Sequence, residues 1–278
     1  MFPLIAALSQ AGGIIIDKIT LTRQRVEIKV FVPILFVFLF FLTVVAFPWL
    51  GWISADFFDL KHQILFWAMI AVAIVWNILY YRGAQAEKVQ DFELIVMGQP
   101  LVTILLASIF LQNERNWPIM AVAIVAAIAL IFAHVKKEHF EFSKESWGLI
   151  LAVVLMSVEL ILIDLLLNVF SPVALYAVRT GVIASFFYFY YQPHLRLVSS
   201  NHYGLIATSA ALGVIQMITK FYGFQVFGVV YTSLILILAP VLVYIISTLW
   251  MHERLKSRTL VCGLVILICV LYATLIGT

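Results

Sequence analysis

The chain has 278 residues, of which 64% are hydrophobic and only 11% are charged, and its mean hydropathy is +1.11. This composition excludes an ordinary soluble domain and indicates an integral membrane protein. The formal net charge of +3 is small and scattered over the connections, without the basic patch that nucleic-acid binding requires, so nucleic acid is excluded as a partner.

Long apolar runs, separated by short polar turns, follow one another along the whole chain. Each is close to the ~20 residues that a helix needs to cross a bilayer. They predict an all-α fold of ten membrane-spanning helices in the cell membrane, with no connection long enough for a soluble domain. In chain order these helices are residues 2–22, 29–50, 63–81, 93–111, 117–135, 147–168, 172–191, 203–223, 228–250 and 259–277.

One pattern occurs twice in the sequence. In each copy a proline within an apolar segment is followed by a Glu-Arg pair: Pro100 with Glu114 and Arg115, and Pro240 with Glu253 and Arg254. A period of about 140 residues over half the chain indicates duplication. We therefore predict two repeats, residues 1–138 and 139–278, of five helices each. Because five is odd, the second repeat enters the membrane in the opposite orientation.

Repeats of opposite orientation are related by a pseudo-two-fold axis in the membrane plane. A site at their interface opens to each side of the membrane in turn when one half rocks on the other. The sequence thus predicts a secondary transporter that works by alternating access around a site at the midplane.

The doubled pattern, with Ser171, Pro172 and Arg179 at the start of the seventh segment, resembles the EamA-like family of the drug/metabolite transporter superfamily. The resemblance covers nearly the whole chain, although the second segment lacks a counterpart of Arg179. It implies ten helices in two five-helix repeats and transport of a small organic solute. Export of an amino-acid-like metabolite is our leading expectation. Related carriers move drugs, nucleotide-sugars and sugar phosphates, so the cargo stays open.

Two opposite charges flank the turn between the sixth and seventh segments. A lone ionised group in hydrocarbon costs at least ~2.5–3.5 kcal/mol, so each buried charge needs a partner or a function. Asp164 and Arg179 lie at matching depth on either side of Pro172. We predict that they form a structural ion pair, which keeps both buried. Contact of Arg179 with the substrate is the alternative.

Glu159 lies near the middle of the sixth segment, with no basic residue three or four positions away. Burial disfavours the charged form of a carboxyl, so we expect it to be neutral and protonated. One interpretation is that Glu159 couples a proton to substrate movement as the site faces each side. The other is that it is a protonated glutamic acid that only forms a hydrogen bond with a neighbouring helix.

Several other polar residues lie inside the apolar segments. Four amides near one depth predict a hydrated cavity between the halves, although each alone is as often an interhelical hydrogen bond: Gln10, Asn77, Gln99 and Gln216. Lys220, near the end of the eighth segment, either snorkels to the interface or binds an anionic group of the substrate. Pro100 and Pro240 predict helix kinks at matched places, which serve either rocking or packing.

The distribution of basic residues predicts the orientation of the chain in the membrane. Most basic residues of the connections fall on one side, which places both termini outside the cell, whereas the family resemblance implies cytoplasmic termini.

The chain lacks a phosphate-binding loop, a His-Glu-x-x-His motif and a Gly-x-Ser-x-Gly elbow, and its histidines lie at segment ends. We therefore expect no enzyme, metal or cofactor. The alternatives are a membrane-embedded protein that handles lipid or polyprenyl headgroups and a passive channel. Coupling ion and dimerisation stay open.

Overall fold

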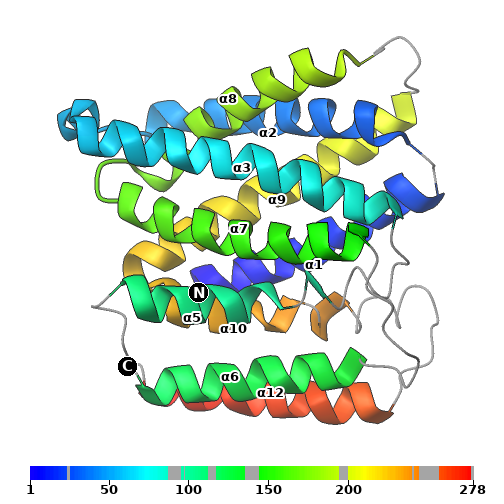
Figure 1. The fold of residues 1–278 in the computed structure, drawn as a ribbon, viewed down its shortest axis with the longest axis vertical. Helices are drawn as coiled ribbons and strands as arrows, with labels where there is room; N and C mark the ends of the chain where they lie inside the picture. The colour runs from blue at the N-terminus through cyan, green and yellow to red at the C-terminus, as the bar shows by residue number, and fades with distance from the viewer. Residues whose placement is uncertain are drawn as a thin grey trace. The chain divides into compact units, whose positions relative to one another are not determined.

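The computed structural model describes residues 1–23, 26–86, 95–96, 98–111, 117–134, 144–193, 200–239, 241–243 and 257–276 (Figure 1). Its α-helices are α1 (Phe2–Lys18), α2 (Ile28–Leu50), α3 (Leu60–Ala86), α5 (Gln99–Phe110), α6 (Trp117–His134), α7 (Lys144–Leu166), α8 (Pro172–Tyr191), α9 (Ser200–Phe227), α10 (Val229–Leu236) and α12 (Ser257–Ile276). A π-helix, η1 (Ile19–Arg23), extends α1, and a 3-10 helix, η2 (Ala55–Phe58), precedes α3.

The prediction of an all-α membrane protein is confirmed. The described α-helices occupy the predicted segments in order, and α8 begins and ends where the sequence places it. Six of them are long and apolar enough to cross a membrane. The shorter apolar helices are Gln99–Phe110, Trp117–Ala129, Val229–Val243 and Gly263–Tyr272. The chain is thus an integral, multi-pass membrane protein.

Local signals at both ends explain the length of α8. Ser171 caps the helix by accepting a hydrogen bond from the Ala174 backbone N–H at 3.1 Å. Pro172 lies in the first turn, where its missing N–H removes no helical hydrogen bond. The helix ends at Gln192, whose φ of 45° is left-handed. The 20 residues between these signals extend about 30 Å, the thickness of the hydrocarbon core.

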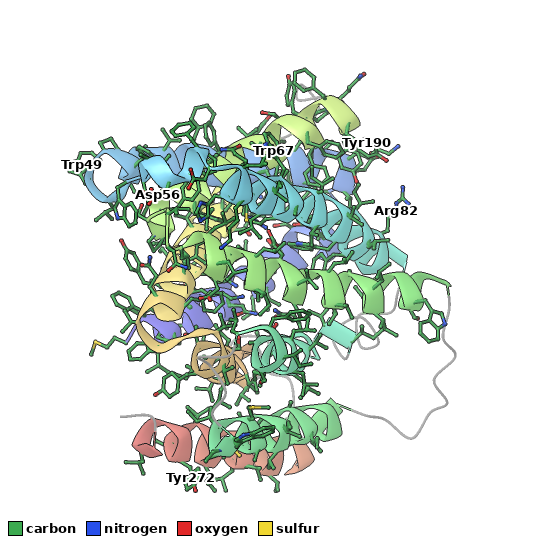
Figure 2. The ribbon with its side chains drawn as sticks, turned by 60° about the vertical axis from the view of Figure 1, so that its left-hand side comes forward. Trp49, Asp56, Trp67, Arg82, Tyr190 and Tyr272 are labelled. Atoms are coloured by element: carbon green, nitrogen blue, oxygen red, sulfur yellow. The ribbon has the colours of Figure 1, made fainter. Side chains whose placement is uncertain are left out.

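Aromatic side chains near the helix ends face outward. Trp49, at the end of α2, is 77% exposed, and Tyr190, at the end of α8, is 51% exposed (Figure 2). Trp117 and Trp147, at the beginnings of α6 and α7, are exposed as well. Amphipathic rings favour the headgroup region, so these residues mark the boundaries of the membrane-spanning segments.

The first compact unit of the chain contains Met1–Ile70 and Ile163–Tyr222. Within it α2 and α8 pack side by side (Figure 1). Phe36 lies against Phe187 with ring centroids 5.5 Å apart, and Phe40 lies against Gly181. A Cβ on Gly181 would come within 2.8 Å of the Phe40 ring, so this approach depends on glycine. The order of the contacts makes the two helices antiparallel.

Helices α1 and α9 also run antiparallel in the first unit. Phe2 at the beginning of α1 stacks on Tyr222 near the end of α9, with ring centroids 5.3 Å apart. Gly12 in the middle of α1 lies against Leu212 in the middle of α9. Opposite directions are expected for the first and eighth spans, because an odd number of steps separates them.

Two connections far apart in the sequence join at one end of this unit. Ser54 donates a backbone hydrogen bond to the Val169 carbonyl at 2.9 Å, and Ser171 donates one to the Trp52 carbonyl at 3.0 Å. The Trp52 N–H in turn donates to the Ser171 hydroxyl at 3.0 Å. The connection after α2 and the connection after α7 therefore lie on the same side of the membrane, as an even number of intervening spans requires.

The second compact unit contains Ala71–Leu162 and Gly223–Thr278. In it α6 packs along α12, and α10 packs on α5 and α6 (Figure 1). Small side chains make the buried face of α6: Ala123, Ala126 and Ala127. Small residues let membrane helices approach closely, and that contact replaces the hydrophobic driving force that lipid does not provide. Each unit draws helices from both halves of the chain, so these spatial units are a different division from the predicted repeats.

A single residue, Gly228, separates α9 from α10. Its N–H donates to the Phe224 carbonyl at 2.9 Å and ends α9, and its carbonyl accepts from the Thr232 N–H at 3.2 Å and begins α10. Its φ of 83° and ψ of 168° lie in a region that glycine adopts and other residues avoid. The chain therefore changes direction here without a longer loop.

Candidate functional site

Glu159 is buried in the second unit and is held by a tryptophan. It lies on α7 with 2% of its surface exposed, and Trp76 of α3 donates from Nε1 to its Oε2 at 2.7 Å. Tyr80, one turn along α3, meets Trp76 edge to face with ring centroids 6.0 Å apart. This hydrogen bond matches the predicted contact with a neighbouring helix, although Glu159 is its acceptor. The proton-coupling interpretation stays a prediction.

Glycines let α3 and α7 come close enough for this hydrogen bond. A Cβ on Gly83 of α3 would lie 3.2 Å from Leu149 of α7, and one on Gly148 of α7 would lie 3.7 Å from Leu79 of α3. The position of the carboxyl therefore depends on helix packing as well as on the hydrogen bond.

A second polar network joins α5 to α7. Gln99 donates from Nε2 to the Thr103 hydroxyl at 3.1 Å, and the Thr103 and Ser157 hydroxyls are 3.0 Å apart. Thr103 and Ser157 are fully buried. The predicted substrate-contact residue Gln99 thus belongs to an interhelical hydrogen-bond network, and Thr103 and Ser157 are members that the sequence did not single out.

Asn77 is buried on α3, next to Trp76 in the sequence. Its Nδ2 donates to the Ala73 carbonyl at 2.8 Å, on the preceding turn of its own helix. It is 1% exposed. Its hydrogen bond to Ala73 therefore lies within α3, and its role as a substrate contact stays a prediction.

In the first unit a carboxyl and a hydroxyl join α1 to α9. The Ser209 hydroxyl donates to Asp17 Oδ1. The two residues are 192 positions apart in the chain, so the sequence alone does not pair them. The neighbouring Lys18 side chain lies outside the described residues. Asp17 and Ser209 are therefore a polar contact that sequence reasoning missed.

Two basic side chains are buried in the first unit. Arg179 on α8 is 3% exposed, and Lys220 on α9 is 7% exposed. Tyr176, one turn before Arg179, meets Phe221, the residue after Lys220, with ring centroids 5.9 Å apart. Neighbouring stretches of α8 and α9 therefore carry these charges. Asp164 is half-buried on α7, and its ion pair with Arg179 stays a prediction.

The predicted site residues are distributed over both compact units. Unit 2 holds Asn77, Gln99 and Glu159, and unit 1 holds Gln10, Asp164, Arg179, Gln216 and Lys220. Gln10 and Gln216 are half-buried on α1 and α9. The single hydrated cavity expected from the four amides stays a prediction. Within the part of the chain that is described, no group of three His, Cys, Asp or Glu side chains is placed to hold a metal ion.

Pro100 lies at the beginning of a helix. It occupies the first turn of α5, after a turn at Gly98, instead of bending a continuous helix as predicted. The physical reason is that a proline lacks the N–H that a helix interior needs, whereas the first turn leaves that group unbonded. Pro240 lies outside the described residues, so the matched kink cannot be compared.

These features define a class, the multi-pass membrane proteins that bury polar side chains between their helices. Residues 144–275 match the EamA-like transporter family, which confirms the resemblance that the sequence motifs indicate. The match falls within the second predicted repeat. A solved structure, described as "Crystal structure of protein", has a TM-score of 0.79 and 14% identity, and the comparison covers 99% of this chain and 96% of that one. At such identity the likeness shows the fold alone. Comparison with curated proteins gives no match.

Proposed function

We propose that the protein is a secondary active transporter that moves a small organic solute across the membrane by alternating access. An amino-acid-like metabolite, carried outward, is the substrate we favour. The match of residues 144–275 to the EamA-like transporter family carries this proposal. Buried polar groups on α3, α5 and α7 support it, because such groups are costly in a membrane and occur where substrates or protons pass.

Helix pairing supports two inverted repeats within this proposal. If residues 1–138 and 139–278 are equivalent, α2 corresponds to α8 and α6 corresponds to α12. Each of these pairs packs together within one compact unit. A pseudo-two-fold axis in the membrane plane brings equivalent helices together in opposite directions, and α2 and α8 are antiparallel. The same axis makes α1 equivalent to α7 and α3 equivalent to α9. It therefore converts the contact of α1 with α9 into the contact of α7 with α3.

Glu159 is the residue to which we assign proton coupling. An ionised carboxylate accepts a stronger hydrogen bond than a neutral carboxyl does. Loss of the proton therefore tightens the bond from Trp76 and holds α3 more firmly to α7, and protonation loosens it. This links the proton to the freedom of two helices to move. The residues we propose for substrate contact are Gln10, Asn77, Gln99, Gln216 and Lys220, with Asp164 and Arg179 as a supporting ion pair.

The test is solute movement in proteoliposomes. Purified protein is reconstituted with a panel of amino acids, with and without a pH gradient, and both accumulation and counterflow are measured. We expect counterflow of at least one solute and accumulation that requires the gradient. Glu159→Gln is expected to lose gradient-driven accumulation while retaining counterflow, because glutamine cannot exchange a proton. Glu27→Gln, which changes an exposed glutamate, is the matched control and is expected to behave as the wild type.

Two results contradict different parts of the proposal. Gradient-driven accumulation by Glu159→Gln would leave Glu159 as a structural hydrogen-bonding residue. Downhill flux without counterflow of any solute would indicate a passive channel and reject the carrier.

A further inference from the structure

Helix α10 carries two neighbouring hydroxyls that have no hydrogen-bond partner in the part of the chain that the structure describes. Thr232 is fully buried and Ser233 is 2% exposed. Neither Thr232 Oγ1 nor Ser233 Oγ has a hydrogen-bond partner among the described residues. A buried hydroxyl without a partner is unfavourable, and more so inside a membrane, where water does not replace the missing group. Within the described part of the chain, these two hydroxyls are therefore left to donate to a ligand.

Other hydroxyls in this protein behave differently. Serine and threonine inside membrane helices commonly donate to the carbonyl three or four residues earlier. In this chain Thr43 donates to Leu39 at 2.6 Å, and Ser108 donates to Ile104 at 2.6 Å. Thr232 and Ser233 make no such local hydrogen bond, so their hydroxyls differ from the others in this respect.

The position of the two hydroxyls indicates which chemical group of a ligand they can bind. They lie four and five residues after Gly228, which immediately precedes α10. No side chain caps this N-terminal end of the helix. Helical side chains lean toward the N-terminus, which carries the positive end of the helix dipole. Two hydroxyl donors beside a positive helix end favour an acceptor oxygen with negative charge and disfavour an ammonium group.

We propose that Thr232 and Ser233 form a binding site for a carboxylate of the transported solute. The inference rests on the proposed transport function and deepens it by naming the group that the substrate must carry. The two hydroxyls donate to the carboxylate oxygens when the solute binds. A substrate with only an amine does not bind there.

The first experiment compares stability without ligand. Thr232→Val and Ser233→Ala remove hydroxyls that have no partner, so the melting temperature of the purified full chain is expected to stay unchanged or to rise by about 2–4 °C. Thr103→Val is the matched control, because its hydroxyl is bonded to Gln99 and Ser157, and its melting temperature is expected to fall. A fall for Thr232→Val equal to that of Thr103→Val would overturn the proposal, because the hydroxyl would then have a partner in the protein.

The second experiment uses matched ligands. L-alanine is expected to raise the melting temperature of the wild type, whereas L-alaninamide, which lacks the carboxylate, is not. Both variants are expected to need about tenfold or more L-alanine for the same shift, as the loss of one charge-assisted hydrogen bond predicts. Stabilisation by inorganic phosphate in place of L-alanine would reject a carboxylate and assign a phosphate. Equal shifts in wild type and variants would mean that the hydroxyls hold ordered water only.

Failure of this inference differs from failure of the transport function. If proteoliposomes show counterflow that Thr232→Val and Ser233→Ala leave unchanged, the carboxylate-binding role of these two residues is rejected and the transport function is retained. If L-alanine stabilises the wild type through these hydroxyls but no solute shows counterflow, the site stands and the carrier is rejected. If L-alanine fails to stabilise the wild type, the carboxylate assignment is overturned.

Discussion

The hydrogen bond between Trp76 and Glu159 allows a quantitative test of the buried acid. Trp76→Phe keeps an aromatic ring and removes the donor to a carboxyl that is 2% exposed. Leaving a buried acceptor without its partner costs ~1–3 kcal/mol. For a chain of this size that corresponds to a fall in melting temperature of about 2–4 °C for each kcal/mol. We expect thermal loss of monodisperse protein in detergent, followed by size-exclusion chromatography, to show this decrease.

A second variant reveals the charge of the carboxyl. A hydrogen bond to an ionised group is about twice as strong as one between neutral groups. If Glu159 is neutral, as its sequence position predicts, Trp76→Phe costs the same in the Glu159→Gln background as in the wild type. If it is ionised, the cost in that background falls by roughly half.

A control on the same helix completes this experiment. Trp67 on α3 is 56% exposed (Figure 2), so Trp67→Phe is expected to change the free energy of unfolding by less than about 0.5 kcal/mol. If Trp76→Phe costs no more than Trp67→Phe, the hydrogen bond to Glu159 does not contribute to stability and the proposed link between proton and helix movement fails.

Two further predictions concern the backbone and the topology. Gly228→Ala is expected to destabilise the protein by ~1–3 kcal/mol, because its dihedral angles are ones that only glycine adopts readily. Gly204→Ala, in an open position on α9, is expected to stabilise the protein slightly. Equal melting temperatures of the two variants would contradict this prediction. In a background without native cysteines, Asp59→Cys and Asn168→Cys are expected to react with a membrane-impermeant maleimide from the same side, and Asn201→Cys from the other. Labelling of Asp59→Cys and Asn168→Cys from opposite sides would contradict the alternation of spans.

Much of the fold could be predicted because apolar length and helix-end signals are local. Ser171 and Pro172 determine where α8 begins, and the predicted and observed limits of that helix coincide. The fourth segment was less accurate, because a proline in an apolar run reads as a kink, while the chain places Pro100 in the first turn of a new helix. Whether a proline bends a helix or begins one depends on the residues packed around it.

The site was predicted only as a set of separate residues. Glu159 and Gln99 were singled out because a polar group in an apolar segment is unusual wherever it points. Trp76 and Ser209 were not assigned as partners of buried carboxyls, because Glu159 and Asp17 lie 83 and 192 residues away from them in the chain. Tryptophan and serine are also common in membrane helices without a function, so their presence carried little information.

The sequence by itself determined the membrane environment, the order of the apolar helices, and the period of about 140 residues that predicts the repeats. Only the tertiary structure decided which helices pair and which side chains meet, such as α2 with α8 and Trp76 with Glu159. The physical reason is that lipid and protein interior are equally apolar. In a soluble helix the buried face is more apolar than the exposed one, but a membrane helix is apolar all round. Hydropathy therefore cannot reveal the faces that pack, and close packing at small residues such as Gly83 and Gly181 does so instead.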